Sequence, residues 1–115
     1  MLATGGEYKY LLMQTAAVAT GNGTAMVCTR AENGGYTACA FQVTGITTAT
    51  ITWEATIDGT NWVAIATTNL ATGTAATTAT ADGLFRVTVI GLMQVRARIS
   101  AWTSGTIYVH GVAVS

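Results

Sequence analysis

The sequence predicts an all-β fold: a single antiparallel β-sandwich, jelly-roll-like, with eight or nine short strands and an N-terminal arm. Apolar and polar residues alternate with a period of two in several stretches, and Gly-containing turn signals separate those stretches. Thr, Val and Ile are abundant, and β-branched side chains suit a pleated, half-buried surface better than a helix. The 115 residues fit one domain, and only 9% of them are charged, which argues against disorder.

The first nine residues, MLATGGEYK, have the character of an arm, so we expect the sandwich to span residues 10–115 and the arm residues 1–9. The apolar cluster that follows the arm predicts the first strand. A short arm of this kind is a natural contact to a neighbouring protein. The candidate contact residues around this junction are Tyr8, Tyr10, Leu11 and Leu12.

The stretch RAENGGY predicts a hairpin, because Asn-Gly favours the positive φ angles that a tight two-residue turn requires. With Asn33 and Gly34 at its centre, Cys28 faces Cys39 across the hairpin. The two cysteines then either remain reduced in the core or form a disulfide, although this type of strand pair holds the Cβ atoms farther apart than a relaxed disulfide prefers. Two cysteines and the single His110 are too few ligands for a closed zinc site.

The stretch TITWEATI shows the clearest alternation, and the turn IDGTNW follows it. Asp58 and Gly59 supply the turn conformation, and Asn61 offers local hydrogen bonds that favour it. Trp62 either caps the end of the sandwich or stacks on a ligand. The residues expected on the inward face of this strand are Ile51, Trp53, Ala55 and Ile57.

The stretches LFRVTVI and QVRARISAW repeat the alternation with their arginines outward, as a partner-binding patch or an ordinary solvated face. The final stretch, TIYVHGVAVS, is apolar on both faces, which suits a strand covered by the core on one side and a neighbouring subunit on the other. The interface candidates in this half are Arg86, Arg96, Arg98, Trp102, Tyr108 and His110. The strands expected along the whole chain are 10–18, 24–30, 36–44, 47–57, 61–67, 74–80, 84–90, 94–102 and 106–114.

The residue inventory gives little support to catalysis. The chain has one histidine and no phosphate-cradling, zinc or EF-hand motif, so we expect neither an enzyme nor a cofactor or metal. Five basic residues balance five acidic ones, which gives nucleic-acid binding no electrostatic support. No apolar run reaches the roughly 20 residues of a membrane span. A surface with so little charge is poorly protected against association, and this favours coverage by protein partners.

Two segments carry a family resemblance: IDGTNWVAI and TATADGLFRVTVIGLMQVRARISAWTSGTIYVHGVAV. Over residues 45–114 the chain resembles the small β-sandwich decoration or cement proteins of tailed bacteriophage capsids, and related head or tail structural proteins. The resemblance implies a virion structural protein on the capsid surface, commonly a homotrimer, that binds and stabilises the shell of major capsid protein. It attaches no catalytic role to the shared residues.

One alternative function comes from another class of protein. A phage tail or fibre carries carbohydrate- or receptor-binding modules, in which exposed aromatic rings stack on sugars. Trp62 and Trp102 would be the stacking platforms, with Asp58 and Asn61 as polar contacts. The state of Trp62, buried or exposed, discriminates between the two functions.

Overall fold

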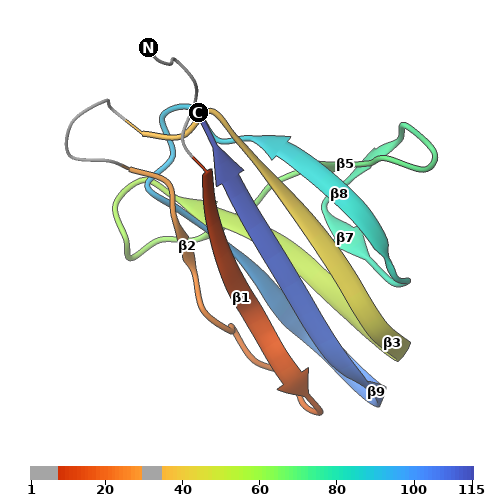
Figure 1. Cartoon of the computed structure of the whole chain (residues 1–115). Helices are drawn as coiled ribbons and strands as arrows, with labels where there is room; N and C mark the ends of the chain where they lie inside the picture. The colour runs from red at the N-terminus through yellow and green to blue at the C-terminus, as the bar shows by residue number, and fades with distance from the viewer. Residues whose placement is uncertain (1–7, 30–34) are drawn as a thin grey trace.

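The computed structural model describes residues 8–29 and 35–115, and the predicted turn residues Asn33 and Gly34 lie outside them. The described residues contain nine strands and no helix, which confirms the all-β prediction (Figure 1). In particular, they include no helix that is long and apolar enough to cross a membrane. The strands are β1 (Tyr8–Ala17), β2 (Met26–Val27), β3 (Ala38–Thr56), β4 (Val63–Ala64), β5 (Thr67–Asn69), β6 (Ala75–Ala76), β7 (Thr78–Ala79), β8 (Gly83–Thr88) and β9 (Gln94–Val114).

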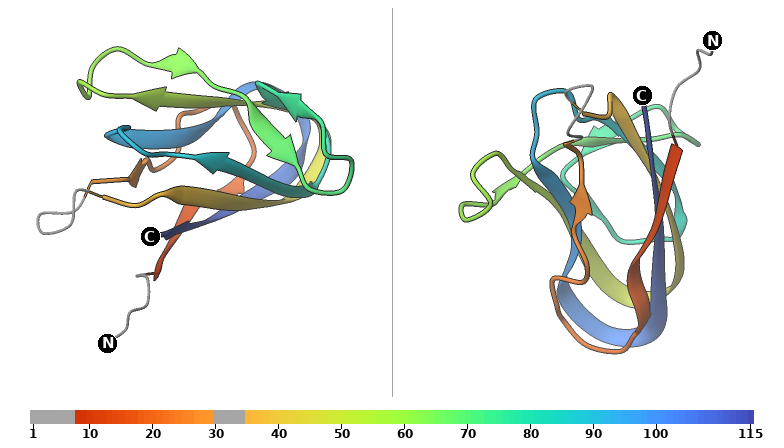
Figure 2. Two further views of the ribbon diagram at one scale, coloured as in Figure 1. Left: turned by 90° about the horizontal axis from the view of Figure 1, so that it is seen from above. Right: turned by 60° about the vertical axis from the view of Figure 1, so that its left-hand side comes forward.

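The strands form one antiparallel sheet that is folded over into two layers. The order along the main path is β1-β9-β3-β8-β5-β6, while β2 pairs with β9, and β4 and β7 pair with β3. Both β3 and β9 bend back on themselves and run through both layers (Figure 2). The first layer contains β1, β8, residues 38–44 of β3 and residues 108–114 of β9; the second contains β2, β4, residues 49–56 and residues 94–102.

The bends correct the predicted strand boundaries, because four predicted strands are halves of two long ones. The predicted breaks contain Gly45 and Gly105, and there the pairing of β3 with β9 shifts register instead of ending. Both glycines have positive φ, 87° and 119°, a conformation that side chains with a Cβ rarely adopt. The carboxylate of Asp82 accepts the backbone N–H groups of Gly45 and Ile46 at 3.1 and 2.9 Å. Local bulges therefore bend each strand into the other layer without interrupting it.

The predicted hairpin pairing around the cysteines is wrong. β2 pairs with β9, and the first half of β3 pairs with β8 and β9. Cys39 lies opposite Val87 and Ala113, whereas the backbone of Cys28 bonds to Met93 and Tyr36. The hairpin signal is local, but tertiary pairing with the two longer strands decides where these segments lie.

The core lies between the layers and is centred on three aromatic rings. Trp53 stacks on Phe41 with ring centroids 4.8 Å apart and contacts Phe85 at 5.3 Å. Ile51, Trp53 and Ala55 are buried as predicted. The prediction is wrong for Ile57, which is 73% exposed because β3 ends at Thr56. Alternation thus places side chains correctly only as far as the strand continues.

Candidate functional site

The outer side of the first layer carries several exposed apolar side chains. Neighbouring inward positions, such as Met13, Phe85 and Val109, are buried, so alternation turns the residues between them toward solvent. We call this surface the aromatic face. It consists of Tyr8 and Tyr10 from β1, Leu84 from β8, and Tyr108, His110 and Val112 from β9.

The aromatic face contains a shallow hollow, where β3 lies between β8 and β9. In the register of the sheet, Val112 lies between Tyr10 and Ala40, and Gln42 lies between His110 and Leu84. The resulting hollow has a volume of about 290 Å³ and is lined mainly by residues of the face. Tyr8 is 69% exposed, Tyr10 51% and Leu84 50%. These side chains present apolar area that the rest of the described chain, residues 8–29 and 35–115, leaves exposed.

A cluster of three rings crosses this face. The Tyr10 hydroxyl and Nδ1 of His110 share a hydrogen bond of 2.6 Å, and their ring centroids are 5.9 Å apart. The ring of Tyr108 lies nearly parallel to that of His110, at 6.3 Å between centroids. His110 is therefore a partnered histidine within a cluster of three rings.

The other predicted contacts of the N-terminal strand divide between the two sides of β1. Leu11 packs against the core, whereas Leu12 is half-buried and lies beside His110 in the register. Of the residues predicted as contacts in the first strand, Tyr8, Tyr10 and Leu12 lie on the outer side of β1, and Leu11 lies on the inner side.

The three predicted interface arginines do not share one surface. Arg86 lies on β8 in the first layer, opposite Ala40. Arg96 and Arg98 lie on β9 in the second layer, opposite Glu54 and Thr52 of β3. Alternation indicates that all three point outward, but the bend in the sheet sends them to opposite outer faces.

The outer side of the second layer carries a charged network, which we call the charged face: Glu54, Trp62, Arg96 and Arg98. Glu54 forms ion pairs with Arg96 at 2.8 Å and with Arg98 at 3.1 Å. The guanidinium of Arg96 lies 4.0 Å from the centroid of the Trp62 ring. These contacts satisfy the charged groups within the chain. Glu54 was not predicted as a partner, although its place directly opposite Arg96 follows once the register of β3 with β9 is known.

The two tryptophans considered as sugar platforms both have internal contacts. One face of the Trp62 ring is covered by the guanidinium of Arg96, which places this residue beside the outer side of the second layer. Trp102 is half-buried against the core and donates its Nε1–H to the carbonyl of Gly105 at 3.1 Å. This hydrogen bond lies at the bend of β9 near Gly105.

The turn at IDGTNW forms as predicted. Asp58 Oδ1 accepts the backbone N–H groups of Thr60 and Asn61, both at 2.8 Å, and Oδ2 accepts the Asn61 side-chain amide at 2.7 Å. The Asn61 backbone bond, followed by the bonds from the Asn61 side chain, Thr60 and Thr56, holds the pKa of the Asp58 carboxyl well below its usual value. Gly59 has a φ of 80°, which explains glycine at that position. Within residues 8–29 and 35–115, no group of three His, Cys, Asp or Glu side chains could hold a metal ion.

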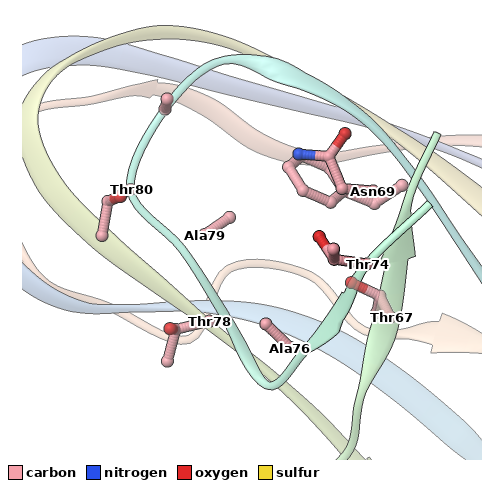
Figure 3. Close-up of a pocket in the computed structure, with 9 residues that line it drawn as sticks. Thr67, Asn69, Thr74, Ala76, Thr78, Ala79 and Thr80 are labelled. Carbon is pink, nitrogen blue, oxygen red and sulfur yellow. The ribbon is translucent and has the colours of Figure 1, made fainter. Parts of the chain in front are cut away.

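A second hollow, of about 170 Å³, lies beside the short strands β5, β6 and β7. Figure 3 shows Thr67, Thr74 and Asn69 along one side of it and Ala79 and Thr80 along the other. The Thr67 hydroxyl is buried and has no hydrogen-bond partner among the described residues. The hollow is lined mainly by Thr and Ala, and its volume is smaller than that of the hollow in the aromatic face.

No protein-family model matches this sequence, and no curated protein sequence matches it either. The fold, in contrast, occurs in solved structures. SPBc2 prophage-derived protein YomS is similar to this chain with a TM-score of 0.85 and 19% identity, over 100% of this chain and 99% of YomS. PBSX exported protein XepA is similar with a TM-score of 0.89 and 16% identity, over 98% of this chain and 39% of XepA. The two-layered fold described here thus forms nearly all of one protein and a part of a longer one.

Proposed function

We propose that this chain is a structural protein of a bacteriophage virion, and specifically a decoration or cement protein that binds the major capsid protein. The observation that carries the proposal is the aromatic face, an exposed surface of aromatic and aliphatic side chains on the outer side of the first layer. Large exposed apolar surfaces on small domains mark sites of protein association, and Tyr is enriched in protein interfaces. The prophage origin of one protein with the same fold supports a phage context.

The aromatic face suits binding to a large, preformed protein surface. Its side chains come from adjacent strands, so binding requires little ordering of the backbone. Tyr10 and His110 are already fixed by their mutual hydrogen bond, which limits the side-chain entropy lost on binding. A standard interface buries about 800 Å² on each partner, and many copies on a shell would multiply that stabilisation. We propose a homotrimer on the lattice, as the family resemblance implies.

The alternative, a carbohydrate-binding module, receives less support from the geometry. Trp62 carries Arg96 on one face of its ring, and Trp102 is half-buried with its N–H bonded to Gly105. The Asp58 carboxylate and the Asn61 side-chain amide form hydrogen bonds with the turn backbone and with each other. We therefore propose protein docking as the function.

The test measures binding to capsids of the encoding phage that were assembled without this protein. Leu84→Arg places a charge in the aromatic face, at a side chain that is already half exposed, so the fold should be retained. We expect its affinity for the capsids to fall at least tenfold, since a charge buried against an apolar surface lacks a partner. Co-sedimentation over a range of protein concentrations gives the affinity.

Ile90→Arg is the matched control, because Ile90 is 69% exposed but lies in the β8–β9 connection, outside the aromatic face. It should bind as the unmodified chain does. The capsid proposal is contradicted if the unmodified chain does not bind, or if capsids that carry it lose their DNA on heating at the same temperature as bare capsids. Equal loss of binding in both variants would contradict the assignment to the aromatic face.

A further inference from the structure

The hollow beside β5, β6 and β7 lies between the two layers, on the side of the molecule away from β1 (Figure 1). β5 pairs with β8 of the first layer, whereas β7 pairs with residues 51–52 of β3, in the second layer. The chain passes from one layer to the other through β6, which pairs with β5. The hollow is therefore a gap between the layers that these short strands only partly close (Figure 3).

Two polar groups at this hollow have hydrogen-bonding capacity that the described chain does not use. Thr67 is 3% exposed, and its hydroxyl has no hydrogen-bond partner among residues 8–29 and 35–115. Oδ1 of Asn69 accepts the backbone N–H of Ala71 at 2.9 Å, while Nδ2 donates to no group of the described chain. In Figure 3 the Thr67 hydroxyl and the Asn69 amide nitrogen both point into the hollow. Buried hydroxyls are nearly always paired, so the Thr67 hydroxyl favours a polar molecule at this place.

The size and the lining of the hollow limit what it can hold. Its volume of about 170 Å³ far exceeds the roughly 10–15 Å³ that one water needs, but it is smaller than the roughly 300–1,000 Å³ of sites for drug-sized molecules. None of the lining residues is charged. The floor is buried and the rim is exposed, so the hollow opens to solvent. The floor consists of Thr67, Ala79 and Phe85, and the rim of Thr74, Ala76, Thr78, Thr80 and Ala81.

We propose that this hollow binds one neutral hexose ring. The hydroxyl groups of a sugar both donate and accept hydrogen bonds, which matches the Thr67 hydroxyl and the Asn69 amide N–H. The C–H groups of the ring suit the side chains of Phe85 and of the lining alanines. A sugar with a negative charge is disfavoured, because no cation lines the hollow to pair with that charge. The hollow contains no residue of the aromatic face and no tryptophan, so the proposal does not rest on capsid binding.

The test titrates the ¹⁵N-labelled full chain separately with D-glucose, D-galactose and D-mannose and follows the amide signals by NMR. At least one sugar should shift the side-chain amide signals of Asn69 in a saturable way, with a dissociation constant of about 1 mM, since so small a ligand makes few contacts. The uronate of that sugar should bind at least about tenfold more weakly, because its charge has no partner in the hollow. If the hollow holds water only, no sugar gives a saturable shift, and that result overturns the proposal. Equal binding of the sugar and its uronate would also overturn it.

Thr67→Val keeps the shape of the side chain and removes its hydroxyl. It should weaken sugar binding about fivefold, since one hydrogen bond to the ligand is lost. The melting temperature of the free chain should stay the same or rise, because the hydroxyl has no partner within the described chain. A lower melting temperature would contradict the proposal, because it would show that the hydroxyl already has a partner in the fold.

Thr88→Val is the matched control, because Thr88 is exposed on β8 and lies outside the hollow. It should bind the sugar as the unmodified chain does. Equal binding by Thr67→Val and the unmodified chain would overturn the role of the Thr67 hydroxyl, and equal loss in both variants would overturn the location of the site. Capsid binding by the same proteins is measured separately, so failure of either proposal is recognised without the other.

Discussion

Alternation along the strands produces both outer faces of the molecule, but the side chains of the two faces make different contacts. On the charged face, Glu54 pairs with Arg96 and Arg98, and Arg96 also covers Trp62. On the aromatic face, Tyr8 and Leu84 extend into solvent. The charged face satisfies its own groups, whereas the aromatic face leaves apolar area uncovered. The difference separates a surface whose charged groups are paired within the chain from one whose apolar side chains are exposed.

The largest effect on stability is expected at the bend of β3, where Gly45 lets the strand pass from one layer into the other. Gly45→Ala would place a Cβ 1.8 Å from the carbonyl oxygen of Thr106, at a residue with a φ of 87°. Because both the contact and the backbone angle are unfavourable, we expect a loss of about 4 kcal/mol in the free energy of unfolding, or failure to fold. Urea unfolding followed by Trp fluorescence measures it.

Gly73→Ala is the control for the corner, since Gly73 also has a positive φ but its Cβ would meet nothing within 4 Å. It should cost only about 1 kcal/mol, from the backbone angle alone. A similar loss of unfolding free energy in both variants would show that the close contact with Thr106 is not the reason for glycine at position 45.

A smaller effect is expected from breaking the charged face. Glu54→Ala removes the shared partner of Arg96 and Arg98 and leaves two like charges side by side in a partly covered position. We expect a loss of about 2–3 kcal/mol in the free energy of unfolding. Chemical unfolding at low and at high salt tests this, and salt should reduce the loss because it screens the repulsion between the arginines. An equal loss of unfolding free energy in Leu84→Ser, on the aromatic face, would contradict the claim that only the charged face depends on contacts among its own side chains.

The smallest effect concerns the turn that leads from β3 to the charged face. The folded-state pKa of Asp58 is depressed, so its ionised form stabilises the fold above the unfolded-state pKa of about 3.9, and that stability is lost as the pH falls through the lower folded-state value. The stability difference between the unmodified chain and Asp58→Asn should therefore be constant from about pH 7 to pH 5 and shrink below pH 4. Thermal unfolding across this range measures it, and a difference that grows in acid would contradict the assignment.

Much of the fold follows from the sequence, because alternation is a local signal. It identifies the all-β class, the burial of Ile51 and Trp53, and the turn at Asp58. It does not distinguish a glycine that ends a strand from one that bends it, so it predicts breaks at Gly45 and Gly105 where the strands bend. That distinction depends on the facing strand and on Asp82, which binds the bulge from a distant part of the chain.

The candidate surfaces are less predictable for the same physical reason. Alternation separates inward from outward positions but does not say which layer a strand joins, so Arg86 was grouped with Arg96 and Arg98. The aromatic face was partly visible, since Tyr8, Tyr10, Tyr108 and His110 were all named as contacts. Their assembly on one surface requires the pairing of β1 with β9, which joins opposite ends of the sequence.

The position of β9 has a consequence for how the chain reaches this structure. It follows the other eight described strands in the sequence, yet it lies between β1 and β3 in the sheet and also pairs with β2. Until its residues have left the ribosome, three earlier strands lack the neighbour to which they hydrogen-bond. Pairing over such sequence distances slows folding, and strands that wait unpaired are exposed to other chains. Nascent chains of this protein therefore complete the sheet only after residues 94–114 have been synthesised, and a truncation that removes β9 should leave an aggregating fragment, not a smaller domain.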